Sequence, residues 1–231
     1  MKKLIAKVAK KTAQETQKNE LTELVCILDR SGSMSGLESD TIGGFNALIE
    51  KQKQEKGRCL VSTVLFDTET AVLHDRVSIE SVPAMTREDY TPGGCTALLD
   101  AIGGAIDHIG GIHKYARAED VPAHTIFVIT TDGLENASRR YGSDKVKRMI
   151  ERQKEKYGWE FLFLAANIDA VETAAHIGIS RDRAANYRAD GVGTARMFGA
   201  MSKAVCAMRC SEELAEDWAA DIERDAKRGA R

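Results

Sequence analysis

Two mostly apolar runs that each end at an aspartate constrain the fold of this sequence more than any other feature. Residues 22–28 and 125–131 are rich in apolar and β-branched side chains. Such runs are expected of central strands in a parallel sheet, because helices cover both faces of that kind of sheet. Asp29 follows the first run and Asp132 follows the second. The sequence therefore predicts two buried parallel strands with an acidic residue at the carboxyl end of each.

Further strand-like runs alternate with helical patterns along the chain. Additional strands are predicted at residues 59–66, at 71–77 as the antiparallel partner of that run, at 159–165 and, weakly, at 184–187. Apolar residues at helical spacing predict helices after the residues Asp29, Thr96, Asp132, Asp169 and Asp190, and a last helix from Ser211. This alternation predicts an α/β fold with a doubly wound, mainly parallel sheet, one antiparallel edge strand and helices on both faces.

The length of the chain sets the expected domain organisation. Its 231 residues fit one sizeable α/β domain and are short for two. We expect that domain to span residues 21–208. Residues 1–20 are predicted to form a helical extension before it, and residues 209–231 another helical extension after it.

Two adjacent glycines lie inside the first predicted helix. Within a helix Gly43 and Gly44 each cost about 1 kcal/mol relative to alanine. Because glycine destabilises a helix, we expect this pair to serve close packing, with the start of the helix lying against the sheet.

Composition and charge exclude several classes of protein. Hydrophobic residues make up 43% of the chain and charged residues 29%, so a core can form and global disorder is not expected. A formal net charge of −2 gives no electrostatic reason to expect nucleic acid or an anionic membrane as a partner. The basic N-terminal stretch lacks the continuous apolar core of a signal peptide or membrane span, so we expect a cytoplasmic protein.

The cysteines and the missing motifs narrow the chemistry further. The five cysteines are odd in number, and Cys26 and Cys59 lie in strand-like runs, which indicates reduced, buried thiols. Neither a Cys-x-x-Cys pair nor a His/Cys cluster is present, which argues against zinc. The five histidines are scattered. The sequence also lacks a phosphate-binding loop, a dinucleotide fingerprint and a serine-hydrolase elbow.

The loop after the first strand is a candidate cation site. It contributes the carboxylate of Asp29 and the hydroxyls of Ser31 and Ser33. Oxygen donors of this kind suit a hard cation such as Mg²⁺, Mn²⁺ or Ca²⁺. The same residue types are common in polar turns, so this loop alone leaves both interpretations open.

Two more polar positions decide between these interpretations. Thr96 lies in a glycine-rich loop just before a predicted helix, and Asp132 ends the best-marked strand. In doubly wound sheets, ligands bind beyond the carboxyl ends of the strands, where these loops meet. Two carboxylates and three hydroxyls then converge, and with added water they make up the shell of one octahedral cation.

These motifs resemble the von Willebrand factor type A domain, in particular its intracellular bacterial type. The resemblance rests on three motifs, which are Asp-x-Ser-x-Ser at 29–33, Gly-x-Thr ending at Thr96 and Thr-Asp-Gly at 131–133. The resemblance covers roughly residues 21–208. It implies that Asp29, Ser31, Ser33, Thr96 and Asp132 form a metal-ion-dependent adhesion site.

The resemblance also implies a function. It predicts a non-enzymatic protein-binding module that holds Mg²⁺ or Mn²⁺, with Ca²⁺ ranked after them. A protein partner would offer a Glu or Asp side chain to the open position on the ion, and Asp29 would act partly through hydroxyl or water contacts. Neither nucleic acid nor a membrane is expected as a partner.

Two alternatives stay open at this stage. The first is a metal-dependent hydrolase or phosphotransferase with Asp29 as nucleophile. Such enzymes typically carry a second acid two residues on, where this chain has Ser31, and no lysine for a phosphoryl group is evident near the three loops. The second alternative is a structural subunit with a vestigial site.

Residues around the loops have weaker predicted roles. Glu135, Asn136 and Ser138 shape the rim of the site or belong to an ordinary polar turn. Asp169 is expected to cap a helix rather than to bind a ligand. The other candidates, for the mouth or the edge of the site, are Ser35, Glu38 and Asn167.

Overall fold

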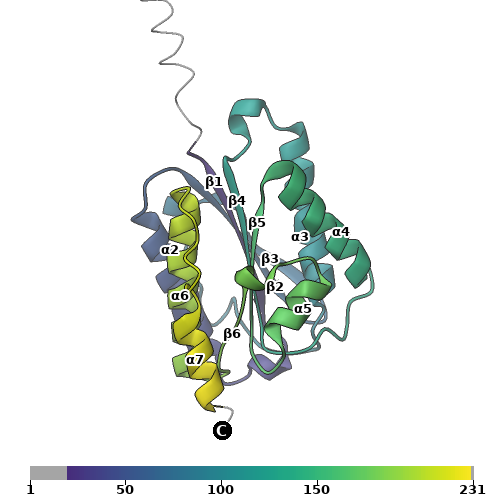
Figure 1. Ribbon diagram of the computed structural model, residues 1–231, viewed down its shortest axis with the longest axis vertical. Coiled ribbons are helices and arrows are strands. Elements are labelled where there is room, and N and C mark those ends of the chain that lie inside the picture. Colours follow the sequence, from purple (N-terminus) through teal and green to yellow (C-terminus); the bar gives the residue numbers. More distant parts are fainter. Residues whose placement is uncertain (1–19, 230–231) are drawn as a thin grey trace, which may run out of the picture.

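A six-stranded sheet organises the computed structural model, which describes residues 20–229. The strands are β1 (Thr22–Asp29), β2 (Cys59–Phe66), β3 (Thr70–Ser78), β4 (His124–Thr131), β5 (Glu160–Ala165) and β6 (Ala184–Asn186). Their order across the sheet is β3-β2-β1-β4-β5-β6. All neighbours pair in parallel except β2 and β3, so the doubly wound sheet with one antiparallel edge strand is confirmed (Figure 1).

Helices cover both faces of this sheet. They are α2 (Glu38–Lys53), α3 (Leu98–Tyr115), α4 (Ser143–Tyr157), α5 (Ala170–His176), α6 (Gly191–Arg209) and α7 (Ala220–Gly229). Helices α2, α6 and α7 lie on one face, and α3, α4 and α5 lie on the other (Figure 1). The extension predicted for residues 1–20 falls almost entirely outside the described residues. None of the helices within residues 20–229 has the length and apolarity needed to cross a membrane.

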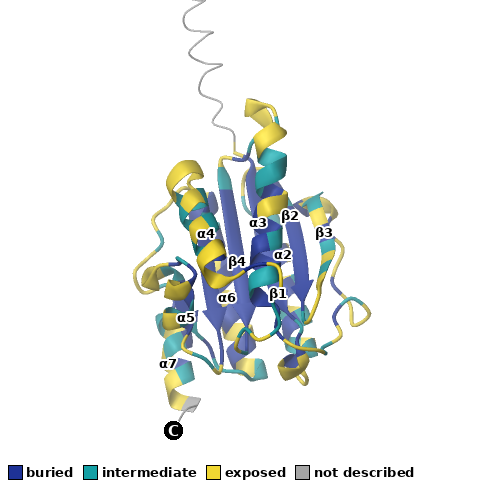
Figure 2. Cartoon of the chain, turned by 90° about the vertical axis from the view of Figure 1, so that its right-hand side faces the viewer, coloured by how far each residue is buried: buried dark blue, intermediate teal, exposed yellow. Residues whose placement is uncertain are grey.

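The central strand β1 supplies both hydrophobic cores. All eight of its residues are buried, and side chains alternate between the two faces of a strand. Leu24 and Leu28 therefore join the core under α2 and α6, while Val25 and Ile27 join the core under α3 and α4. Figure 2 shows this dark, buried sheet between helices whose outer faces are exposed.

The pairing of β1 with β4 sets the place of the predicted site. The two strands run parallel, and Leu28 lies opposite Thr130. Asp29 and Asp132 follow one and two residues further on. Both aspartates therefore reach the same edge of the sheet.

The structure corrects the reason for the glycine pair in α2. A Cβ atom built on Gly44 would lie 2.1 Å from the ring of Phe198, whereas nothing lies within 4 Å of one built on Gly43. The helix therefore packs closely at Gly44 against α6, not against the sheet as the sequence suggested. Gly43 faces open space.

The last helix begins later than predicted. Ser211, where a helix was expected to start, has a left-handed backbone with φ of 57°. Its amide and that of Glu212 donate to carbonyls of the last turn of α6, which ends that helix in a hydrogen-bonded turn. Residues 212–215 have no regular structure, residues 216–219 form a turn, and α7 begins at Ala220.

Matched substitutions at the two glycines test this packing. We expect Gly44→Ala to lower the free energy of unfolding by about 1–3 kcal/mol, because the added methyl group displaces the Phe198 ring. Gly43→Ala should raise it by up to about 1 kcal/mol, since alanine favours the helix and meets no neighbour. Chemical denaturation of both variants measures the difference, and equal effects would contradict the packing described.

Candidate metal site

The five predicted ligands lie on three loops at one edge of the sheet. Asp29 is the last residue of β1, and Ser31 and Ser33 follow it in a tight turn. Thr96 precedes α3, and Asp132 directly follows β4. Four of these residues are at most 3% exposed, whereas Ser33 is open to solvent.

Short polar contacts join these loops. The Ser31 and Ser33 hydroxyls are 3.0 Å apart, and the Ser33 hydroxyl donates to Asp132 Oδ1 at 2.5 Å. Gly133 lies beside both Ser33 and Thr96, since a Cβ built on it would be 3.5 Å from Ser33 Oγ and 3.6 Å from Thr96 Oγ1. The structure therefore gathers three hydroxyls and the Asp132 carboxylate around one region.

Asp29 stabilises the serine loop and its connection to β4 through hydrogen bonds. Its Oδ1 accepts a hydrogen bond from the Ser31 amide at 2.7 Å, and its Oδ2 accepts one from the Thr131 hydroxyl at 2.6 Å. The hydroxyl of the buried Tyr90 donates to the Asp29 carbonyl. One carboxylate oxygen thus holds the serine loop and the other holds the end of β4. That Asp29 acts on a cation through hydroxyl groups stays a prediction.

Sequence reasoning missed Thr131 and Tyr90. A signal for Thr131 existed, because it is the last residue of β4 and directly precedes Asp132. Tyr90 lies in the linker between β3 and α3, and nothing in the sequence near it indicates contact with β1.

The Thr96 loop is held from two sides. On one side the Thr96 amide donates to Asn136 Oδ1 at 2.9 Å, and the Thr96 carbonyl accepts from the amide of Asn136 at 3.0 Å. On the other side the Cys95 amide donates to the Thr68 hydroxyl at 2.8 Å. The loop after β4 and the β2–β3 turn together fix the Thr96 hydroxyl beside Gly133.

The residues with weaker predictions mostly have structural roles. Glu135 Oε2 and the Ser138 hydroxyl accept the Leu99 and Asp100 amides, both at 3.0 Å, and so cap the start of α3. Glu135 Oε1 also accepts the amides of Ala137 at 3.0 Å and Ser138 at 2.8 Å, as in a polar turn. Asn136 positions Thr96 as described.

Three other weaker candidates also act locally. Asp169 caps α5 as predicted, by accepting from the Glu172 amide at 2.9 Å. Asn167 donates to the Asp132 carbonyl at 3.2 Å and so steadies that loop. Glu38 accepts from the Gly36 amide at 3.0 Å, and Ser35 is exposed.

Burial raises the pKa of both carboxyl groups of the site. For Asp29, burial outweighs the hydrogen bonds from Thr131 and Ser31, which lower the pKa. For Asp132, burial is again the largest cause, and the nearby Asp29 raises its pKa further against the hydrogen bond from Ser33. Within residues 20–229 neither carboxylate forms an ion pair with a basic side chain. Two negative charges are therefore close together without a protein counter-charge.

The donor set of this site suits a hard cation. All side-chain donors are oxygens, which Mg²⁺, Mn²⁺ and Ca²⁺ prefer. No cluster of three or more His, Cys, Asp or Glu able to hold a metal occurs in the part of the chain that the structure describes. A metal site here consequently depends on hydroxyls as well as on its two carboxylates. Because no basic side chain of the described residues pairs with these carboxylates, a bound cation would balance their negative charge.

Comparison with known proteins gives the fold a name. No family model matches the sequence, and no curated protein matches it. Among solved structures, the von Willebrand factor domain of the pili tip protein Mfa5 from Porphyromonas gingivalis aligns with a TM-score of 0.58 and 11% identity, covering 84% of this chain and 98% of that one. The protein therefore has the von Willebrand factor type A fold.

Two further structures are similar over most of this chain. The manganese-loaded TRAP protein of Plasmodium vivax has a TM-score of 0.54 and 17% identity, covering 78% of this chain and 72% of that one. The proximal thread matrix protein 1 of the mussel byssus, with a zinc-occupied MIDAS motif, has a TM-score of 0.55 and 13% identity, covering 80% of this chain. This chain spans only 46% of the length of the mussel protein.

The raised pKa of Asp132 predicts a pH signature of the metal-free protein. Because the folded state binds this proton more tightly than the unfolded chain, the carboxyl group lowers the free energy of unfolding as the pH rises above 3.8. We expect Asp132→Asn to be more stable than the wild type at pH 7 in chelator, with the difference vanishing in acid. Denaturation curves across this pH range measure it.

Asp89 provides a control of opposite sign. The hydrogen bonds from the Thr86 hydroxyl and amide lower the pKa of Asp89. Its contribution to stability is present above pH 3.8 and is lost as the pH falls through the lowered pKa. Asp89→Asn should therefore be less stable than the wild type at pH 7. A destabilised Asp132→Asn at neutral pH would contradict the charge balance described for the site.

Proposed function

We propose that this protein is a cation-dependent protein-binding module. Mg²⁺ or Mn²⁺ binds among Asp29, Ser31, Ser33, Thr96 and Asp132, and a partner protein adds a Glu or Asp side chain to the ion. The observation that carries this proposal is the contact chain from Ser31 through Ser33 to Asp132, which joins the loops after β1 and β4.

The charge of the site favours binding of a further anion. Hydroxyls carry no charge, so a divalent ion held largely by hydroxyls keeps positive charge that an outside carboxylate can neutralise. Ser33 is exposed, which leaves one side of the site open to a partner. Leu134, two residues after Asp132, is 65% exposed and offers an apolar contact beside the ion.

Metal-bound structures of the same fold support the proposal. The Plasmodium vivax protein was crystallised loaded with manganese, and the mussel protein with zinc in its MIDAS motif. Their low identity to this chain shows the fold alone. The assignment of the cation here therefore rests on the oxygen donors of this chain.

The position of Asp29 disfavours the hydrolase alternative. An attacking carboxylate needs a free oxygen that can reach the substrate. Asp29 is fully buried, and both of its oxygens already accept hydrogen bonds, from Ser31 and Thr131. The side chain is placed to support a loop rather than to attack a phosphorus atom.

Thermal denaturation with and without metal tests the cation site. We expect Mg²⁺ or Mn²⁺ at about one hundred times its Kd to stabilise the wild type by about 2.7 kcal/mol. Asp132→Ala and the double variant Ser31→Ala/Ser33→Ala should lose this shift. Asp169→Ala is the matched control, because it removes a helix-capping aspartate outside the site and should keep the shift. Equal shifts in all four proteins would rule out the site.

Affinity capture tests the partner half of the proposal. Wild-type protein used as bait in lysate of its own cell should retain a partner in Mg²⁺ and release it in chelator, because the ion forms part of the contact. Asp132→Ala should retain none under either condition, and Asp169→Ala should behave as the wild type. A partner that chelator does not release, and that Asp132→Ala also retains, would contradict metal-dependent binding.

A further inference from the structure

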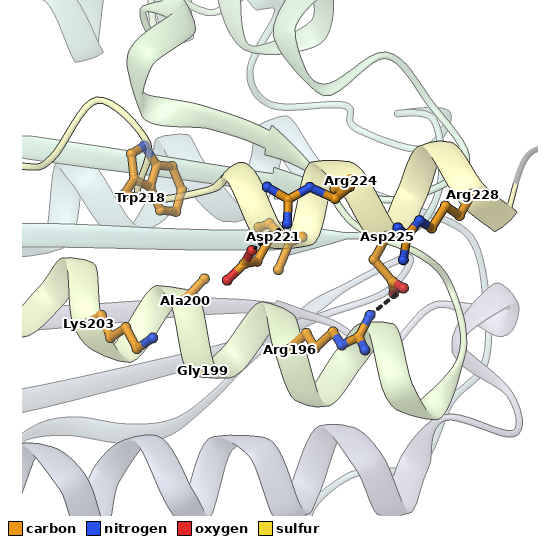
Figure 3. Close-up of a pocket in the computed structure, with 10 residues that line it drawn as sticks. Arg196, Gly199, Ala200, Lys203, Trp218, Asp221, Arg224, Asp225 and Arg228 are labelled. Atoms are coloured by element: carbon orange, nitrogen blue, oxygen red, sulfur yellow. Dashed lines mark hydrogen bonds and ion pairs between the residues drawn. The ribbon is translucent and has the colours of Figure 1, made fainter.

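A cavity lies between α6 and α7, built from elements that contribute nothing to the metal site. Its volume is about 410 Å³, a size typical of small-molecule sites. The small residues Gly199 and Ala200 of α6 line it, together with Trp218 before α7 and Ile222 of α7. Figure 3 shows charged side chains from both helices reaching into the space between them.

The cavity has more positive than negative charge. Four cations line it, namely Arg196, Lys203, Arg224 and Arg228, against two carboxylates, Asp221 and Asp225, which leaves a net charge of +2 (4 − 2). The carboxylates pair with Arg224 and Arg196. Lys203 and Arg228 are exposed and have no ion pair within the described residues. The net charge and these two unpaired cations favour an anionic ligand.

The two oxygens of the Asp225 carboxylate, which lines the cavity, have different surroundings. The Asp225 side chain is 8% exposed, and its Oδ1 pairs with both Arg188 and Arg196. Its Oδ2 is buried and has no hydrogen-bond partner among the residues that the structure describes. Buried polar atoms are usually paired, so this oxygen is suited to accept a hydrogen bond from a ligand hydroxyl or amine.

The opposite end of the cavity is suited to a flat ring. The Trp218 indole donates from Nε1 to the Asp182 carbonyl at 2.9 Å, which fixes its ring. Nothing lies within 4 Å of a Cβ built on Gly199, so the cavity beside it is open. In Figure 3, Trp218 and Lys203 lie at one end, and Arg196, Asp225 and Arg228 lie at the other.

We propose that this cavity binds a nucleoside diphosphate. The base lies against Trp218 near Lys203, a sugar hydroxyl donates to Asp225 Oδ2, and the phosphates pair with Arg228 and Arg196. Seven residues of α7 separate Asp221 from Arg228, or about 10 Å at 1.5 Å per residue, which suits a ligand with a ring at one end and phosphates at the other.

Titration of the full chain with ADP, GDP, CDP and UDP tests this proposal. Chelator is included, so that phosphate cannot bind through a cation at the other site. Trp218 fluorescence is the readout in a Trp159→Phe background, since the chain has only two tryptophans. We expect at least one diphosphate to bind with a Kd below about 1 mM, and at least tenfold more tightly than its nucleoside or pyrophosphate alone.

Matched variants locate the binding. Lys203→Glu/Arg228→Glu should weaken it at least about tenfold, because the variant loses the Arg228 partner of the phosphates and reverses the net positive charge of the cavity. Gly199→Leu should abolish it without loss of thermal stability, by filling open space in the cavity. Lys145→Glu/Arg148→Glu, a double charge reversal on α4, and Gly111→Leu on α3 are the controls and should bind as the wild type. Gly111, like Gly199, has no neighbour within 4 Å of a built Cβ.

Three results would overturn the proposal. The first is that none of the four diphosphates binds below about 1 mM. The second is that pyrophosphate binds as tightly as the best diphosphate, which would leave an anion site without nucleoside recognition. The third is that Gly199→Leu and the double charge reversal bind as tightly as the two control variants.

Discussion

The buried hydrogen bond from Thr131 to Asp29 connects the fold of this protein to its site. It joins the ends of β1 and β4, which pair in parallel at the centre of the sheet. At the far side of Asp29, the Ser31 amide donates to the other carboxylate oxygen and turns the serine loop toward Asp132. This carboxylate orients the loop that carries Ser31 and Ser33, whereas Asn136 and Thr68 hold the loop of Thr96. Asp132 instead faces the hydroxyls directly.

The same arrangement has an electrostatic cost. Asp29 and Asp132 have no basic partner within the described part of the chain, and burial raises the pKa of both. Arg30, which lies between Asp29 and Ser31, turns away and pairs with Asp67 at 2.9 Å. The nearest arginine in the sequence is thus held by another acid, and the divalent cation that we propose for the site would supply the counter-charge. Uncompensated charge of this kind is typical of functional sites, which reduce the free energy of unfolding of the protein in return for function.

Much of the fold could be predicted from the sequence, because it follows from local patterns. The apolar runs at β1 and β4 indicated buried parallel strands, and the adjacent strand-like runs at residues 59–66 and 71–77 indicated the hairpin of β2 and β3. The five candidate ligands could be chosen because each follows a strand or precedes a helix on the same edge. Their spatial convergence is visible in the structure, while their binding of metal stays a prediction.

The remaining features depend on contacts between distant segments. Tyr90 reaches the Asp29 carbonyl from a linker, Asn136 fixes Thr96 across 40 positions of sequence, and Gly44 meets Phe198 of another helix. No periodicity in a single sequence encodes such pairs. The late start of α7 has a similar origin, since the left-handed Ser211 ends α6 in a turn that helical spacing does not reveal.

Anomalous diffraction from a crystal grown with Mn²⁺ tests the central claim most directly. The account predicts one strong manganese peak between the loops after β1 and β4. It should lie within coordination distance, roughly 2.0–2.6 Å, of the Ser31 and Ser33 hydroxyls, with one coordination position open to solvent or filled by an outside carboxylate. A crystal that contains Mn²⁺ at saturating concentration but shows no peak there, or shows its strong peak elsewhere, would contradict the account.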